Sequence, residues 1–355
     1  MINYKKNYFV LFRITLFTLF YSDGFAKILT VSNNPVIKAQ YNQIQTAIDA
    51  STVGDTLYVH KSPTSYSAFN VTKKLTFIGS GHKPIIESNL TAAFEAVNLI
   101  GNASESTFIG VWFKGGIYTL SGDKQFNNLV FVKCRFTNIV YLDYSTLPSN
   151  NVLFESCVFA YLQIYMSRFD NVIFSNCIFS NSTDFRTGVS KTGIVFSNNL
   201  FLETPNPFLN LNNAIISNNI FYKSKLSTLT SFEGNQLNNN IIYNIENDVT
   251  IGGAALNTIS NLITTDPQFK NFPIAASTGS YFSTLYQYDF FLDPTSPGIN
   301  AGTDGKNIGL SDKIFSLYGT PSIPQITTFI IKNNVVNYGT PGDAVNMKVS
   351  VSGTK

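Results

Sequence analysis

The sequence is poor in charge. Only 13% of its 355 residues are charged, about half the usual share of a globular chain, and its 24 Lys and Arg residues are not clustered. A nucleic-acid-binding protein needs a clustered basic surface, so the composition argues against this class. The hydrophobic fraction of 44% argues equally against intrinsic disorder, which combines low hydrophobicity with high net charge.

Beyond its first residues the chain also lacks long apolar runs. Lys5, Lys6 and Arg13 flank the short apolar stretch 14–20, and small residues lead up to Ala26, which is the pattern of a secretory signal peptide. We expect a signal peptide over residues 1–26 with cleavage near Ala26, although an uncleaved membrane anchor is the alternative. The mature protein is then secreted or held at the cell surface, and is not an integral membrane protein.

What the chain does contain is a repeat of about 21 residues. Apolar residues alternate with other types up to a Cys or Asn, and an apolar residue and a Phe follow directly. With the Cys or Asn as a marker, the copies centre on Val111, Cys134, Cys157, Cys177, Asn199, Asn219, Asn240 and Asn261. Such a period is typical of a solenoid of stacked coils.

The alternation predicts the interior of each coil. Apolar residues lie five and three positions before the marker and two after it, so two short strands meet at a tight corner. Stacked coils then place like residues over one another about 4.8 Å apart. We expect two interior aromatic ladders, Phe108, Phe131, Phe154, Phe174 and Phe196 in one and Phe113, Phe136, Phe159, Phe179, Phe201 and Phe221 in the other.

The marker residues should form a ladder of their own. A buried Asn needs its amide hydrogen-bonded, and a stack at a corner offers backbone partners to every amide. Cys can fill the same position as a small apolar residue. We therefore assign the three cysteines to the core rather than to disulfides or a metal site, and we expect no resident metal.

Two solenoids share this spacing. A leucine-rich repeat would need a regular second half with helix-spaced Leu, whereas the segments between markers resemble short strands of varying register. A third strand per coil gives an all-β, single-stranded right-handed parallel β-helix, which we favour. Ile44, Ala47 and Ile48 have helical spacing and predict an N-terminal capping helix, with Asn42 and Gln45 as a capping pair.

Two stretches carry a family resemblance. The sequence IQTAIDAS at 44–51, followed by VGDTLYV at 53–59 and LTFIGSG at 75–81, resembles the opening of secreted right-handed β-helix proteins of the pectate-lyase-like superfamily. The residues at 266–269 and 296–302 resemble the closing segment of bacterial members. The resemblance covers about residues 38–310 and implies that the helix hides the first unpaired edge. We expect the β-helix over residues 27–310 and, where the repeat ends, a C-terminal strand tail over 311–355.

One apolar stripe is unexplained by the repeat. The residue after each marker should face outward, yet Val158, Ile178, Leu200, Ile220, Ile241 and Leu262 are all apolar. An uncovered stripe of this length would promote association. We expect the C-terminal tail or a partner protein to cover it.

The candidate site lies on the inter-motif strands. Enzymes of the superfamily are expected to need paired carboxylates, or acidic calcium ligands with a Lys or Arg base, so calcium enters as a cofactor only if the protein is a lyase. In this sequence few residues on these strands could serve in catalysis, and Asp184 and Arg186 are weak candidates for a catalytic pair. As a ligand-binding face, the set is Tyr141, Asp143, Gln163, Tyr165, Asp184 and Arg186.

These residues suit sugar binding better than catalysis, because tyrosine rings stack and amides hydrogen-bond. We expect the protein to bind an extracellular polysaccharide or a cell-surface component. A polysaccharide lyase or glycoside hydrolase acting on a uronate-containing polymer is the alternative.

Overall fold

The computed structural model of the protein describes residues 26–79, 90–120, 122–145, 147–160, 163–180, 184–186, 191–204, 207–209, 211–224, 232–243, 257–272, 285 and 288–311. All but the last residue of the expected signal peptide, and all of the expected tail beyond Ser311, lie outside this part of the chain.

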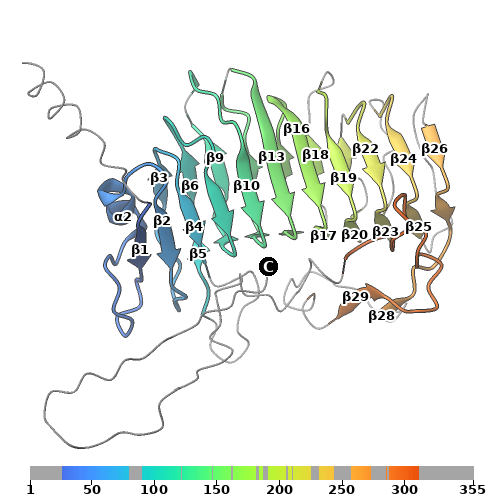
Figure 1. The fold of residues 1–355 in the computed structure, drawn as a ribbon, viewed down its shortest axis with the longest axis horizontal. Helices are drawn as coiled ribbons and strands as arrows, with labels where there is room; N and C mark the ends of the chain where they lie inside the picture. Colours follow the sequence, from blue (N-terminus) through green and yellow to red (C-terminus); the bar gives the residue numbers. More distant parts are fainter. Residues whose placement is uncertain are drawn as a thin grey trace, which may run out of the picture.

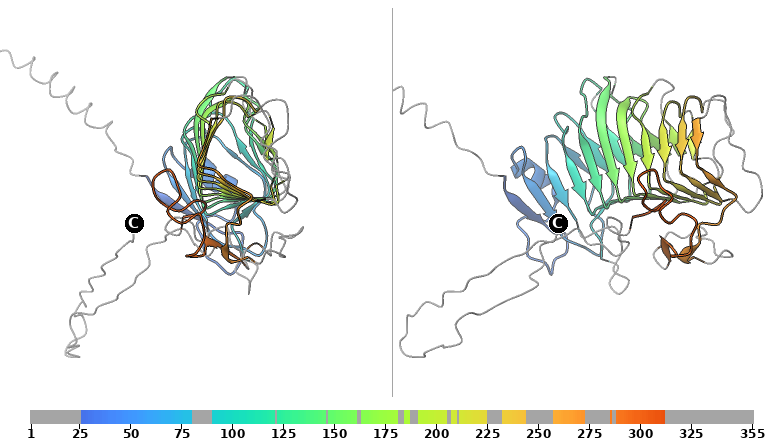
Figure 2. Two further views of the ribbon diagram at one scale, coloured as in Figure 1. Left: turned by 90° about the vertical axis from the view of Figure 1, so that its right-hand side faces the viewer. Right: turned by 45° about the vertical axis from the view of Figure 1, so that its right-hand side comes forward.

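The chain winds into a parallel β-helix with three strands in each full coil, as Figures 1 and 2 show. The first sheet contains β1 (Ile28–Val31), β2 (Thr56–Val59), β4 (Thr76–Ile78), β7 (Thr107–Ile109), β10 (Leu129–Val132), β13 (Ser149–Glu155), β16 (Phe169–Ser175), β19 (Val195–Ser197), β22 (Ile215–Ser217), β24 (Gln236–Asn238) and β26 (Asn257–Ile259), in this spatial order. The β-helix predicted from the repeat is therefore confirmed.

Two further sheets close the coils. The second sheet contains β5 (Ala93–Phe94), β8 (Trp112–Phe113), β11 (Arg135–Phe136), β14 (Val158–Ala160), β17 (Ile178–Ser180), β20 (Leu200–Leu202), β23 (Ile220–Tyr222), β25 (Ile241–Tyr243) and β27 (Leu262–Ile263). The third sheet contains β3 (Phe69–Val71), β6 (Val97–Leu99), β9 (Ile117–Thr119), β12 (Val140–Tyr141), β15 (Gln163–Tyr165), β18 (Asp184–Arg186) and β21 (Phe208–Leu209).

A single backbone feature makes the corner between the first and second sheets. The residue before each marker has a positive φ, which turns the chain without an extra loop. Seven of these residues have φ between 49° and 58°: Lys133, Ser156, Asn176, Asn198, Asn218, Asn239 and Ser260. Asparagine predominates because its short polar side chain tolerates this left-handed conformation better than most residues do.

The markers stack behind this corner as expected. The three cysteines are buried and form no disulfide. The stack of markers continues from Cys to Asn where the backbone amide of Cys177 donates to Asn199 Oδ1 at 2.8 Å. Asn199 N donates in turn to Asn219 Oδ1 at 2.9 Å, while Asn219 Nδ2 donates to the Phe196 carbonyl at 2.9 Å. The side chains of Asn199 and Asn219 thus form hydrogen bonds with backbone groups of the preceding coils, which compensates for the burial of their polar amides.

Both aromatic ladders are present in the interior. Successive rings of the first ladder lie 4.8 to 5.3 Å apart and within 10° of parallel, and Phe77 extends it by one coil. Those of the second ladder, from Phe113 to Phe221, lie 4.6 to 4.8 Å apart. The two ladders meet edge to face, for example at Phe154 and Phe159, which is the favoured geometry for aromatic pairs.

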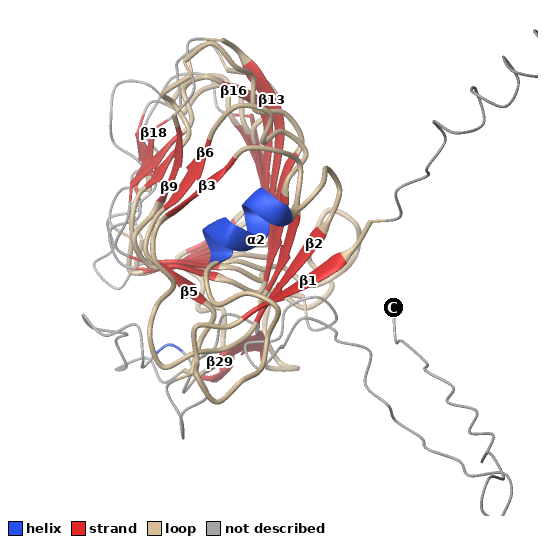
Figure 3. Cartoon of the chain, turned by 90° about the vertical axis from the view of Figure 1, so that its left-hand side faces the viewer, coloured by secondary structure: helices blue, strands red, loops and turns tan. Residues whose placement is uncertain are grey.

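Helix α2 (Ile44–Ala50) lies across the N-terminal end of the coils, as Figure 3 shows. Ile44, Ala47 and Ile48 are buried as predicted, and Lys73 Nζ donates to the carbonyls of Ile48 and Ser51. The expected capping pair is wrong, because the helix begins after Gln43 with no side-chain cap. Within the described ranges, no helix is long and apolar enough to cross a membrane.

The parallel coils end at β27, and the chain then returns along the outside of the second sheet. We call the described residues 266–272, 285 and 288–311 the strap. It contains β28 (Phe269–Asn271) and β29 (Asp289–Leu292), which pair antiparallel. Figure 2 shows these strands and the following loops in brown outside the coils.

The strap covers the outward apolar stripe. Val158, Ile178, Leu200, Ile220 and Ile241 are at most 1% exposed. They form one cluster with the strap residues Phe272, Leu285, Phe290, Leu292, Ile308 and Leu310, while Leu262 is half-buried at its edge. The stripe is thus covered from within the chain by residues that precede the expected tail, and the tail beyond Ser311 lies outside the described residues.

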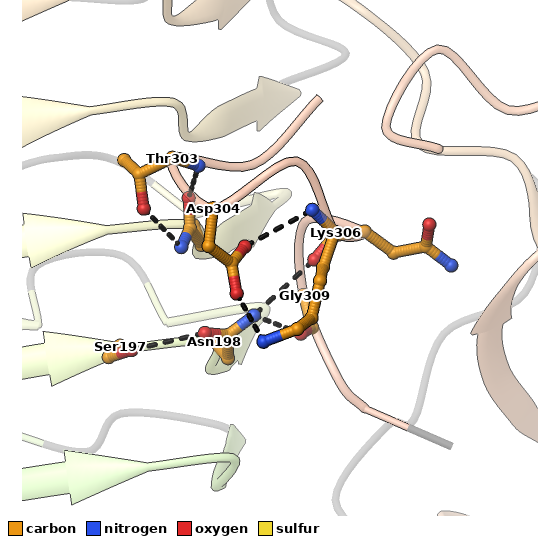
Figure 4. Close-up of polar contacts among 8 residues, drawn as sticks. Ser197, Asn198, Thr303, Asp304, Lys306 and Gly309 are labelled. Carbon is orange, nitrogen blue, oxygen red and sulfur yellow. Dashed lines mark hydrogen bonds and ion pairs between the residues drawn. The ribbon is translucent and has the colours of Figure 1, made fainter. Parts of the chain in front are cut away.

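The corner asparagines hold the strap in place. Asn239 Nδ2 donates to the Ala301 carbonyl at 2.7 Å, and Asn218 exchanges two hydrogen bonds with Thr303. One coil nearer the N-terminus, Asn198 Nδ2 donates to the Gly309 carbonyl at 3.1 Å. In the coil before that, Asn176 Oδ1 accepts from the Ser311 amide. Figure 4 shows the middle of this contact, where Lys306 pairs with Asp304 within the strap.

Candidate functional site

The outward face of the third sheet carries a column of tyrosines. Strand pairing places Tyr118, Tyr141, Tyr165 and Arg186 in register on β9, β12, β15 and β18, one residue per coil. The residues beside them, such as Ile117, Val140, Ile164 and Phe185, point inward and are fully buried. The column is therefore fixed by the strand alternation that builds the core.

Three members of the column, Tyr141, Tyr165 and Arg186, contact one another in turn. The rings of Tyr141 and Tyr165 lie 5.1 Å apart at an interplanar angle of 49°, and the Arg186 guanidinium lies 5.2 Å from the Tyr165 ring centre. The Tyr165 hydroxyl donates to Gln163 Oε1 at 2.7 Å. All four of these side chains are half-buried, so each keeps part of its surface in solvent.

Polar groups continue the column toward the N-terminal end. Asn98 is in register with Tyr118, and Asn70 with Asn98; their amides are joined by a hydrogen bond of 2.9 Å. The Tyr118 side chain points toward the residues that precede its strand, and its hydroxyl donates to the Gly115 carbonyl at 3.2 Å. A side chain at Gly115 would overlap the Glu95 carbonyl, so this close approach requires glycine.

Of the six residues predicted for the site, the structure brings four into one outward patch. Tyr141, Tyr165 and Arg186 share the column, and Gln163 lies beside it. Asp184 occupies the position in register with Gln163, and its side chain lies outside the described part of the structure.

Asp143 is separated from this patch. It lies two residues beyond Tyr141 along the chain, whereas Asp184 lies two residues before Arg186, so four residues along the strand direction separate the two positions on the backbone. That offset is about 13 Å, and the two coils between them add about 10 Å at right angles. The carboxyl groups of a glycosidase pair lie about 5 to 9.5 Å apart, and the strand register does not bring these two positions side by side.

The environment of Asp143 is nonetheless unusual. Burial raises the pKa of its carboxyl above the ordinary value, while hydrogen bonds from Ser167 and from the Arg168 amide act in the opposite direction. The carboxylate accepts the Arg168 amide at the turn into β16, which is a role in shaping that turn. In the described part of the chain, no group of three or more His, Cys, Asp or Glu residues could hold a metal ion.

Sequence reasoning missed Tyr118 and the two asparagines. Tyr118 follows Phe113 by five residues, as Tyr141 follows Phe136, and this equal spacing was a usable signal. Tyr165 follows Phe159 by six residues and Arg186 follows Phe179 by seven, so the register of the column drifts in the sequence although it is straight in the structure.

No protein-family model matches the chain, and neither does any curated protein. Among solved structures the chain is similar to one described as "Geobacillus virus E2 - ORF18", with 11% identical residues and a TM-score of 0.28. The match covers 72% of this chain and 62% of that chain, less than two thirds of its length. A likeness this weak carries no argument about function.

Proposed function

We propose that this protein is a secreted or cell-surface β-helix protein of the pectate-lyase-like kind, from a bacterium, that binds an extracellular carbohydrate or surface component. The binding face is the outward column of the third sheet. The observation that supports it most is the tyrosine column itself, which repeats an aromatic ring once per coil on a solvent-facing surface.

The tilt of the rings separates this column from the ladders of the core. Interior Phe pairs along each ladder are within 18° of parallel, so each ring covers the face of the next. The 49° between Tyr141 and Tyr165 leaves part of each ring face uncovered. Uncovered aromatic faces with hydroxyls at their edges suit a ligand that is apolar on its ring faces and polar at its rim, as sugars are.

Polar partners for such a ligand lie within the same patch. Gln163 offers an amide, the tyrosine hydroxyls offer donors and acceptors, and Arg186 offers a fixed cation at one end of the column. A guanidinium recognises carboxylates and sulfates through paired hydrogen bonds, so acidic polysaccharides should bind more tightly than neutral ones. Their affinity should fall as the salt concentration rises.

The test is affinity electrophoresis of the mature protein in gels that contain neutral or uronate-containing polysaccharides. Retardation by at least one polymer should be lost in Tyr141→Ala and Tyr165→Ala and kept in Tyr58→Ala, which removes a half-buried tyrosine from the first sheet. Equal retardation of all three variants would overturn the assignment of the face.

The same samples test the alternative of catalysis. Incubation with the uronate polymers, with and without added calcium, should give no unsaturated product if the protein only binds. Product formation that disappears in Asp184→Ala or Arg186→Ala would replace binding with lyase activity. N-terminal sequencing of the exported protein tests whether the mature chain begins near Ala26.

A further inference from the structure

The outward face of the first sheet carries a second apolar surface, which the repeat pattern did not single out. Seven strands, β4 to β22 in the order of the sheet, each present two outward positions, giving fourteen positions in two columns. Eight of these are apolar, and we call them the outer strip: Ile78, Ile109, Val130, Val132, Leu153, Ile173, Val195 and Ile215. Strand pairing makes the strip continuous, because Ile78, Ile109 and Val132 share one column and the other five share the next.

The outer strip reaches solvent, with two of its eight residues exposed and six half-buried, whereas the apolar stripe on the second sheet is covered. Ile173 and Ile215 are 40% and 41% exposed, whereas Ile178, on the second sheet of the same coil as Ile173, is fully buried beneath the strap. The first sheet faces the viewer in Figure 1, and no described helix or strand lies in front of it. An exposed apolar strip on a regular sheet marks a surface that is buried in an assembly.

We infer that this face is the contact between two copies of the protein, packed sheet against sheet and antiparallel about a two-fold axis. The first reason is the period of the surface. Side chains recur along this face once per coil, about every 4.8 Å, and form rows with grooves between them. A second copy carries the same repeat, so its rows of side chains fit into the grooves along the whole contact. A globular partner with an irregular surface has no such match.

The charges of the face also suit a contact between identical copies. A two-fold contact brings like surfaces together, so repeated charges would repel one another. Of the fourteen outward positions only Glu155 is charged, and it lies at the side of the apolar column rather than within it. The borders are polar, with Asn128, Asn151 and Asn171 hydrogen-bonded in a row along one side and Ser175, Ser197 and Ser217 in register along the other. Toward the N-terminal end the asparagine row continues with Glu105 and Lys74, whose opposite charges are paired with each other.

The area is sufficient for a stable dimer. A two-fold axis at β16, the seventh of the eleven strands, lets nine strands of each copy overlap, and nine steps of about 4.8 Å by two columns of about 6.6 Å give an area on the order of 570 Å² per copy. Two copies together bury on the order of 1,100 Å², which exceeds the roughly 1,000 Å² expected of a specific interface. The apolar centre with a polar rim is also the usual anatomy of such a contact.

The register of the dimer follows from the strip. The longer apolar column runs from Val130 to Ile215 with Ile173 at its middle, so an antiparallel pairing that buries all five residues places the axis at Ile173. Ile173 then faces its own counterpart, and Val130 of one copy faces Ile215 of the other. This arrangement leaves the third sheet of each copy, with its tyrosine column, outside the contact.

Sedimentation analysis over a range of concentrations tests the dimer. The full-length mature protein should sediment as a dimer, and Ile173→Lys should raise the dissociation constant by at least about tenfold, since it buries a charge in an apolar contact. Ile263→Lys is the matched control, because Ile263 is 44% exposed on β27 of the second sheet, and it should leave the constant unchanged. Thermal unfolding of both variants checks that the fold is kept.

Cross-linking tests the register. Facing sheets pack about 10 Å apart, so a bismaleimide reagent of about that span should cross-link Ile173→Cys with itself and Val130→Cys only when it is mixed with Ile215→Cys. The three native thiols are buried, and the wild type provides the background. If the full-length mature protein is a monomer at every concentration, the inference is overturned. This holds even if removal of residues 312–355 then produces a dimer, because the tail would be what covers the face in the full-length protein. Cross-linking of Val130→Cys with itself would overturn the antiparallel arrangement.

Discussion

Asn218 and Thr303 lie 85 residues apart and hold each other through two reciprocal hydrogen bonds. The Thr303 amide donates to Asn218 Oδ1 at 2.9 Å, and Asn218 Nδ2 donates to Thr303 Oγ1 at 3.0 Å. The same asparagine has a φ of 58° and turns the chain from the first sheet into the second. One residue thus shapes a coil and fixes the strap to it.

These two roles can be separated by substitution. Asn218→Gly keeps the left-handed turn and loses only the contacts of the amide side chain, so amide hydrogen exchange in residues 301–309 should accelerate by about tenfold or more, with a small loss of global stability. Asn218→Ala loses the same contacts and adds backbone strain of about 1 to 2 kcal/mol, so its free energy of unfolding should be lower still. Asn213→Gly is the control, since Asn213 has a φ of 55° at another corner. In this variant the hydrogen exchange of the strap should equal that of the wild type. Acceleration as large as in Asn218→Gly would contradict the role of the Asn218 side chain in holding the strap.

The marker ladder should distinguish Cys from Ala. Asn219→Ala leaves the Asn199 amide and the Phe196 carbonyl without their partner and should cost about 2 to 5 kcal/mol in urea unfolding. Asn219→Cys should cost clearly less, because a thiol at this position can accept from the preceding coil, as Cys177 Sγ does from the Cys157 amide at 3.4 Å. Equal losses for both variants would show that the amide hydrogen bonds are not what stabilises the stack.

The buried thiols should make the protein sensitive to alkali. Burial raises the pKa of Cys134 and Cys157 well above the ordinary value of a thiol. In the unfolded chain these thiols ionise near pH 8.5, so their contribution to stability is complete below that pH and is lost as the pH rises above it. The free energy of unfolding should fall between pH 8.5 and 9.5 by up to about 1.4 kcal/mol per pH unit for each thiol, and by less in the double variant Cys134→Ala, Cys157→Ala. A thiol reagent should label neither residue in the native protein.

Gly115 should be essential for the position of Tyr118. A Cβ at residue 115 would overlap the Glu95 carbonyl in the neighbouring strand region, and backbone cannot move aside as a flexible side chain can. Gly115→Ala should therefore lower the free energy of unfolding by about 2 kcal/mol or more. Gly122→Ala, where a Cβ meets no atom within 4 Å, should be nearly neutral. Comparable melting temperatures for the two variants would disprove the requirement for glycine.

The sequence predicts the interior far better than the exterior. Phe131, Phe154 and Phe174 could be stacked from spacing alone, because the corner between the first two sheets has a fixed length in every clear repeat. The bend before the third sheet varies in length, so Tyr141, Tyr165 and Arg186 do not align by counting, although the pairing places them in one column. Register in that sheet is set by inward residues such as Ile164 and Phe185, which only the packed core reveals.

The strap shows a different limit of sequence reasoning. The apolar residues after the markers indicated that something covers them, since a row of buried-type residues on an outward face is unfavourable in water. No local pattern identifies which segment does so. The hydrogen bond between Asn176 and Ser311 joins residues 135 positions apart, and such pairings depend on the route of the chain after the last coil.

The strap also acts as a ruler. Solenoids gain and lose whole coils during evolution, because each coil contacts only its neighbours. Here positions 301, 303, 309 and 311 of the strap bind the corners at 239, 218, 198 and 176 in turn, so four successive coils are matched to spacings of two, six and two residues. Duplication or loss of a coil between residues 176 and 239 would shift the corner asparagines relative to their partners in the strap. Homologues that differ in coil number should therefore differ upstream of this region or carry a compensating change of length in the strap.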